Sequence, residues 1–189
     1  MWVPLHKGRA SDQLNYYRPI SLTSIPCKLM EHIVIHYLNQ TLDTVLHDRQ
    51  HGFREGLSCE SQLCATYHDI AHRLDRGDTM HAAVMDFTKA FNKIPYQLLM
   101  KKLSKVSNID SKILMWIYDF LRDRKQCVIV DQNQSPEIAV TSGVPQRFIL
   151  GPTLFLVYIN DLAEQVSCEV SLWCLNISVC KFTNRQSEF

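Results

Sequence analysis

Residues 169–182 read EVSLWCLNISVCKF, with apolar residues on both sides of a turn-forming Asn176. This pattern predicts a β-hairpin. Another strand is predicted upstream at residues 79–87 (TMHAAVMDF), where a continuous apolar run with Asp86 near its end has the profile of a buried strand. The hairpin and the strand predict an antiparallel sheet, and the segments before and between them have helical patterns. The expected fold class is therefore α+β, with the sheet backed by helices.

Capping residues and apolar spacing predict the helices. Ser24 is expected to cap a helix that ends near Leu46, and Ser58 a second helix that Gly77 terminates. Both helices should be half-buried, because apolar residues recur at the i, i+4 spacing of one helix face. These residues are Leu29, Ile33, Val34, Tyr37 and Leu38 in the first helix, and Leu63, Tyr67, Ile70 and Leu74 in the second. The remaining predictions are helices at 96–106, at 110–123, with Asp110 or Ser111 as its cap, and at 151–166, a hairpin at 125–143, and turn-rich chain at 1–23.

The composition is that of an ordinary globular protein. The 189 residues fit one domain or a piece of a larger protein, and 46% hydrophobic with 21% charged residues argue against disorder. A net charge of +1 excludes a strongly basic nucleic-acid binder but leaves room for a local basic patch. Seven cysteines without a C-x-x-C pair argue against a zinc site and a disulfide framework. His32 and His36 lie one helical turn apart without a further ligand at metal-site spacing, which favours a solvated helix face.

The sequence shows neither a targeting signal nor a membrane span. The first 19 residues lack the apolar core of a signal peptide. The segment ILGPTLFLVYI (149–159) is shorter than the ~20 apolar residues that a spanning helix needs. We therefore expect an intracellular protein, in the cytoplasm or nucleus, without a membrane association.

Several segments, taken together, resemble the reverse transcriptase domain of non-LTR (LINE-type, jockey-like) retrotransposons. They are NYYRPISLTSIPCKLMEHI (15–33), RQHGFREGLSCESQL (49–63), DFTKAFNKIP (86–95) and TSGVPQRFILGPTLFLVYINDL (141–162). Their order and spacing match the family from about Val3 to Lys181. The resemblance implies the fingers and palm of a right-handed polymerase, with residues 1–80 fingers-like and 81–182 palm-like. It also implies an RNA/DNA template–primer as partner and Mg²⁺ as cofactor.

The resemblance also implies roles for single residues. Asp86 matches the first of three metal-binding carboxylates and is the candidate catalytic residue. The candidate nucleotide-binding residues are Arg18, assisted by Lys7, for the triphosphate, Phe91 under the sugar, and Gln146 in the loop beneath the nucleotide, where Gly143 gives the backbone close access. The candidate template-side residues are Gln50, Phe53 and Arg54. Without the resemblance, the same residues would be interpreted as solvated charges, a core aromatic ring and loop-packing side chains.

The hairpin at 169–182 is where the family places its other two carboxylates, in a Phe-Ala-Asp-Asp turn. In this register Leu175 and Asn176 replace both acids, and no Asp follows Asp161. Two Mg²⁺ ions about 4 Å apart repel each other as four unit-charge pairs, roughly 16 kcal/mol at an effective dielectric constant of 20, and clustered carboxylates offset that repulsion. With Asp86 alone, we expect an RNA-directed DNA polymerase by descent that binds Mg²⁺ unproductively and is inactive.

Further departures point the same way. Arg147 and Phe148 stand where the family has Gly and a small polar residue, and their bulk would crowd the nucleotide. The chain ends at Phe189, so the thumb of the polymerase is expected to be absent. The alternatives are a non-catalytic remnant that binds nucleic acid or protein, and an open reading frame without a selected function. A single basic face would favour the binding remnant; its candidates are Lys7, Arg18, Arg54, Lys89 and Lys93.

Overall fold

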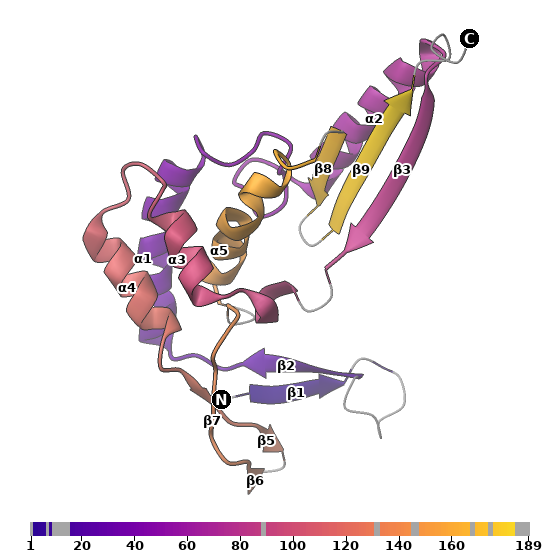
Figure 1. Cartoon of the computed structure of the whole chain (residues 1–189). Helices are drawn as coiled ribbons and strands as arrows, with labels where there is room; N and C mark the ends of the chain where they lie inside the picture. The colour runs from indigo at the N-terminus through magenta and orange to yellow at the C-terminus, as the bar shows by residue number, and fades with distance from the viewer. Residues whose placement is uncertain are drawn as a thin grey trace. The chain divides into compact units, whose positions relative to one another are not determined.

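The computed structural model describes residues 2–6, 8, 16–87, 90–130, 133–144, 148–166, 169–173 and 176–183. Helices and strands follow one another in separate runs along the chain, and the strand pairs in the described residues are antiparallel, so the α+β class is confirmed (Figure 1). The chain forms two compact units. The first unit comprises residues 1–42 and 89–158, and the second comprises residues 43–88 and 159–189. Because both units are discontinuous in sequence, they do not test the predicted division near residue 80, which stays a prediction.

The first unit is mainly helical. Its helices are α1 (Ile25–Leu42), η2 (Ala90–Lys93), α3 (Tyr96–Leu103), α4 (Ser111–Leu121) and α5 (Leu150–Ile159, whose last residue belongs to the second unit). Its strands form antiparallel pairs: β1 (Trp2–His6) with β2 (Tyr17–Ser21), β4 (Lys125–Gln126) with β7 (Ile138–Ala139), and β5 (Ile129–Val130) with β6 (Asn133–Gln134). Fully buried leucines and isoleucines from α1, α3, α4 and α5 form the core, among them Leu38, Leu99, Ile117 and Leu154. The Tyr37 hydroxyl fastens α1 to the segment before α4, since it donates to Asn108 O (2.8 Å) and accepts from Asp110 N (3.0 Å).

The second unit is a helix on a three-stranded antiparallel sheet. Its elements are α2 (Cys59–Asp75), β3 (Thr79–Asp86), η3 (Asn160–Leu162), β8 (Glu169–Trp173) and β9 (Asn176–Thr183). The strand order is β3-β9-β8, so β9 lies in the middle and β3 at an edge. Figure 1 shows α2 running along the sheet, and the hydroxyls of Thr66 on α2 and Ser171 on β8 lie 3.1 Å apart.

Several sequence predictions are confirmed. Residues 169–182 form the β8–β9 hairpin, and residues 125–143 form a hairpin in two short pieces. Ser58 caps α2 in a capping box with Ser61, and Gly77 follows the helix with φ +84° and donates its N–H to Leu74 O (2.9 Å). Asp110 caps α4 by accepting from Lys112 N at 2.7 Å. Local chemistry at helix ends therefore predicts boundaries well here.

Other predictions are wrong. Residues 2–6 and 17–21 form strands rather than irregular chain; Pro4 lies opposite Pro19, and two residues without an N–H hide the strand pattern. The last predicted helix ends at Ile159 rather than near residue 166. Strand β3 exists and lies at an edge of its sheet, but all of its side chains except the half-buried Met80 are exposed rather than buried, with Val84 at 73%.

The predicted helix faces are also partly wrong. On α1, Val34 and Leu38 are buried as expected, whereas Leu29 and Ile33 face solvent. On α2 the apolar side is turned outward: Leu63, Tyr67 and Leu74 are exposed, and the polar Gln62 is buried. The spacing of apolar residues shows which side chains share one face of a helix, but it does not determine which face packs against the protein.

Glu31 is a buried charge that fixes the start of α5. It is 0% exposed, and its Oε2 accepts the backbone N–H groups of Ile149 (2.7 Å) and Leu150 (3.2 Å). Leu150 opens α5, where backbone N–H groups lack intrahelical acceptors and carry partial positive charge. Glu31 is thus a helix cap supplied by another helix. Its Oε1 accepts a hydrogen bond from the Cys27 thiol, with 3.7 Å between Sγ and Oε1. Burial, the charge of Glu31 and this hydrogen bond raise the pKa of the Cys27 thiol.

We expect Glu31→Leu to lower the free energy of unfolding by about 2–5 kcal/mol, because it leaves two buried N–H groups without an acceptor. Glu31→Gln keeps an acceptor oxygen and should cost about half as much or less. Urea unfolding measures both. Glu31→Gln also removes the charge beside Cys27, so alkylation of this thiol should begin at lower pH than in the natural chain, while the exposed Cys59 and Cys64 stay unchanged. Equal stability of the natural chain and Glu31→Leu would contradict this account of the cap.

Candidate functional site

Asp86 lies at one end of the sheet in the second unit, as the last residue of β3. Its backbone is paired with Asn176, the first residue of β9, and Asn176 is paired in turn with Trp173, the last residue of β8. The predicted proximity of Asp86 to the hairpin turn is therefore confirmed at Asn176. Cys174 and Leu175 lie outside the described residues. The register places a single acid opposite an amide.

These residues do not fit a two-metal centre. Within the part of the chain that the structure describes, no group of three or more His, Cys, Asp or Glu side chains is arranged to hold a metal ion. Mg²⁺ prefers hard, preferably anionic oxygen ligands in octahedral geometry. Asp86 supplies one carboxylate, and Asn176 would add only a neutral amide oxygen. A pair of divalent ions needs more negative charge than this end of the sheet contains.

In the first unit, the segment at Gly143 is packed directly against η2. Gly143 N donates to Ile94 O (2.8 Å), Val144 N to Phe91 O (2.7 Å), and the Ser142 hydroxyl to Asn92 O (3.1 Å). Gly143 has φ +83°, and a Cβ there would lie 2.6 Å from Asn92 Cα and from Phe91 O. Only glycine fits this position. The close approach that was predicted toward a nucleotide is made, in the structure, to the chain's own backbone.

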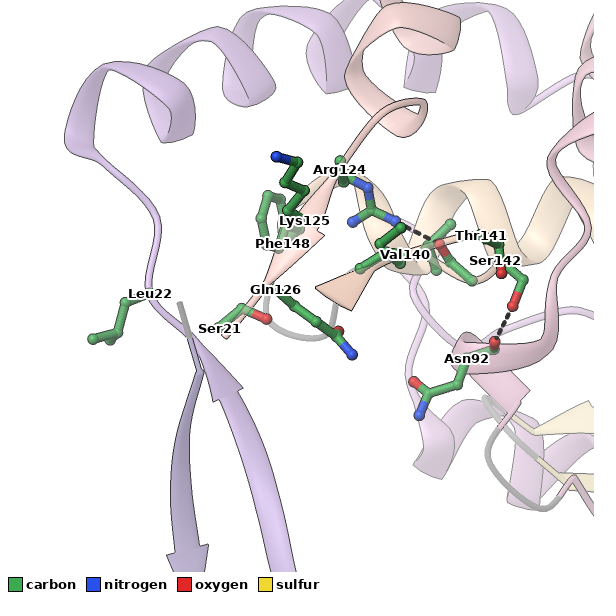
Figure 2. Close-up of a pocket in the computed structure, with 13 residues that line it drawn as sticks. Ser21, Leu22, Asn92, Arg124, Lys125, Gln126, Val140, Thr141, Ser142 and Phe148 are labelled. Atoms are coloured by element: carbon green, nitrogen blue, oxygen red, sulfur yellow. Dashed lines mark hydrogen bonds between the residues drawn. The ribbon is translucent and has the colours of Figure 1, made fainter. Parts of the chain in front are cut away.

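Arg124 holds the same segment from the other side. Its guanidinium donates to Gly143 O (2.8 Å), to the Tyr96 hydroxyl (2.7 Å) and to Leu121 O (3.1 Å). Figure 2 shows Arg124 and Ser142 in the wall of a cavity of about 370 Å³. Neither Arg124 nor the buried Glu31 was singled out from the sequence. A signal existed for Glu31: an acid in an otherwise apolar stripe of a helix is a candidate for an internal partner.

Phe148 lines the same cavity and belongs to an aromatic cluster. Its ring meets Phe120 edge-on at 5.5 Å between centroids, and Phe120 stacks on Trp116 at 5.2 Å. Arg147 and Gln146 lie outside the described residues. The bulk of Phe148, which departs from the family pattern, is therefore accommodated by packing.

The other candidate nucleotide-binding residues are placed as follows. Phe91 lies on η2, with its ring 5.1 Å from that of Phe155 on α5, so it serves as a packing aromatic in the first unit. The backbone of Arg18 is paired with Leu5 in the β1–β2 ladder. Lys7 lies outside the described residues. The roles of Arg18, Phe91 and Gln146 toward a nucleotide stay predictions.

The candidate template-side residues form a compact loop in the second unit. Gln50 is 1% exposed and donates to Gly52 O at 3.0 Å. Arg54 donates to Asp43 Oδ1 (2.6 Å), to Asp43 O (3.2 Å) and to His47 O (3.3 Å), and its side chain is only 10% exposed. Phe53 is 46% exposed and has φ +59°, a conformation that non-glycine residues seldom adopt. Loop packing therefore accounts for Gln50 and Arg54, and their template contact stays a prediction.

A single basic face, the feature that would favour the binding remnant, is not tested by the described side chains. Arg54 is occupied within its own loop, whereas Lys93 is exposed on η2 of the first unit. Lys7 and Lys89 lie outside the described residues, and for Arg18 only the backbone is described. No helix in the described part of the chain is both long enough and apolar enough to cross a membrane.

The sequence of this chain is similar to those of known proteins. The sequence profile of the family described as reverse transcriptase (RNA-dependent DNA polymerase) matches residues 6–182. A probable RNA-directed DNA polymerase from transposon BS of Drosophila melanogaster is 31% identical over 161 residues, 84% of this chain. The RNA-directed DNA polymerase from mobile element jockey and a probable one from transposon X-element, both of the same species, are 26% identical over 85% and 89% of the chain. The chain spans 18% of the length of each of these relatives.

The backbone contact at Gly143 gives a sharp test. Gly143→Ala should lower the free energy of unfolding by about 3 kcal/mol or more, because the new methyl group meets the backbone of residues 91 and 92 in addition to the strain of a positive φ. Gly77→Ala is the matched control: its φ is +84°, but nothing lies within 4 Å of the added Cβ, so only the strain of about 1–2 kcal/mol applies. Thermal melts compare them. Equal losses would show that Gly143 is not held against η2.

Proposed function

Since the chain belongs to the reverse transcriptase (RNA-dependent DNA polymerase) family, we propose that it is a fragment of a retrotransposon RNA-directed DNA polymerase that does not catalyse nucleotidyl transfer. Residues 1–80 would correspond to the fingers and residues 81–182 to the palm. The fragment descends from an enzyme that works on an RNA/DNA template–primer inside the cell. The similarity to polymerases of transposon BS, jockey and X-element supports this origin.

One observation carries the proposed inactivity: the backbone pairing of Asp86 with Asn176. This pairing supports the sequence register in which Leu175 and Asn176 occupy the positions of the second and third carboxylates. A neutral amide in place of a carboxylate removes one full negative charge from the position where two divalent cations would have to be held against their mutual repulsion. The remaining residues can position a nucleotide at most. Phe91 would lie under its sugar, Gln146 beside it, and Arg18 at its triphosphate.

The purified chain should not extend a primer on poly(rA)/oligo(dT) with either Mg²⁺ or Mn²⁺. The expected signal equals that of Asp86→Ala, because the single carboxylate left in the natural chain does not assemble the metal pair. Incorporation of dTTP is measured on a sequencing gel at single-nucleotide resolution. Extension by the natural chain that Asp86→Ala abolishes would contradict the proposal.

Restoring both acids should create a cation-dependent stability. We expect Leu175→Asp with Asn176→Asp to lower the stability of the metal-free chain by roughly 1–3 kcal/mol, because an acid then lies directly opposite Asp86. Mn²⁺ should recover part of this loss, since an ion that binds only the folded state stabilises it. Primer extension should still be absent.

Ser178→Asp is the control for the added charge. It places an acid on the same strand but opposite Val84, which is apolar and carries no carboxylate. The melting temperature should rise on addition of about 10 mM Mn²⁺, a concentration well above a weak dissociation constant, for the double variant only. A Mn²⁺ shift of the natural chain, or one of equal size in Ser178→Asp, would contradict the assignment of the lost acids.

A further inference from the structure

Helix α2 carries two exposed histidines in register with each other. His68 and His72 are four residues apart on α2, so they lie one turn apart on the same side of the helix. Their imidazole rings are nearly parallel, with an interplanar angle of 7°, and their centroids are 6.3 Å apart. Both side chains are exposed.

The backbone under these histidines is firmly held. Ser58 and Ser61 form the capping box at the start of α2, and Gly77 N closes its end on Leu74 O. On another side of the helix, Asp69 forms an ion pair with Arg49 at 2.7 Å, with both side chains partly exposed. Thr66 contacts Ser171 of β8. A ligand that needs two groups at a fixed helical spacing therefore meets a preformed backbone, which lowers the entropy cost of binding.

We propose that His68 and His72 form a two-imidazole chelate for a borderline divalent cation, of the class of Zn²⁺, Ni²⁺ and Cu²⁺, on the outer side of α2. Neutral imidazole suits these ions, and its nitrogen binds zinc at about 2.0–2.1 Å. Tilting the two parallel rings toward their midpoint brings one nitrogen of each to a shared ion without moving the helix. Water completes the coordination.

The electrostatics at this end of the helix favour a cation. His72 lies in the last turn of α2, where backbone carbonyls point toward the C-terminus and carry partial negative charge. The neighbouring Arg73 is directed to Asp78, with 4.0 Å between Nη1 and Oδ2. The positive charge of Arg73 is thus partly balanced by a carboxylate, which limits its repulsion of a bound ion.

This site is independent of the proposed polymerase ancestry. A polymerase centre uses carboxylate oxygens and takes Mg²⁺ or Mn²⁺, whereas two imidazoles select against Mg²⁺. The two proposals can therefore fail separately. Ni²⁺ binding tests His68 and His72, whereas stabilisation by Mn²⁺ of the variant with restored acids tests the end of the sheet at Asp86.

Isothermal titration with NiCl₂ tests the chelate. The natural chain should bind one equivalent of Ni²⁺. The double variant His68→Ala with His72→Ala should bind Ni²⁺ at least about tenfold more weakly, and each single variant should lose most of the affinity. Since both residues are exposed, melts without metal should be the same for all these proteins. MgCl₂ should give no binding heat at the same concentrations.

The matched control is the pair His32 and His36 on α1, which has the same spacing. There His36 Nε2 lies 3.2 Å from the Gln40 side-chain amide, so one imidazole is already engaged. His32→Ala with His36→Ala should leave the Ni²⁺ site intact. The proposal is overturned if Ni²⁺ affinity survives within about twofold in the variant that lacks His68 and His72, or if it is lost in the variant that lacks His32 and His36.

Discussion

The first unit depends on the carboxylate of Glu31. This group holds the amides that open α5, and α5 contributes the most completely buried stretch among the described residues, including Leu150, Leu154 and Leu156. A buried carboxylate is tolerated only where hydrogen bonds replace its water. The N-terminus of a helix supplies such donors together with a favourable dipole. The position of α5 then constrains its neighbours, because Phe155 of α5 packs against Phe91, whose carbonyl accepts Val144 N.

The β3–β9 pairing in the second unit does not depend on the type of residue at position 176. The β3–β9 ladder is continuous from Thr79 opposite Thr183 to Asp86 opposite Asn176. Backbone hydrogen bonds make this ladder, and they do not depend on whether residue 176 is an acid or an amide. An amide at this position also avoids like-charge repulsion beside Asp86. The backbone pairing of the two strands is therefore compatible with either residue type at position 176.

The sequence predicted local features better than burial. The caps at Ser58 and Asp110 and the glycine stop at Gly77 were predictable, because the chemistry of a helix end is contained in a few neighbouring residues. The approach of Asp86 to Asn176 followed from the family resemblance, since pairing across about ninety residues has no local signal. Burial of β3 and of the apolar side of α2 was predicted wrongly, and that of α1 was wrong in part. An apolar stripe indicates that a face can be buried. Whether the face is buried depends on the element that packs against it.

The two cation sites considered differ in what they demand of the fold. A centre of hard oxygen ligands at the end of a sheet needs acids from separate strands to converge, so its charge depends on residues that are distant in sequence, such as 86 and 176. A pair of imidazoles on one helix needs only the local rise of a single turn, which α2 provides wherever it is capped and packed. Substitutions at a strand turn therefore remove the first kind of site without touching the second. A member of an enzyme family can therefore have a metal affinity of one chemical class independently of the affinity that the family's catalysis uses.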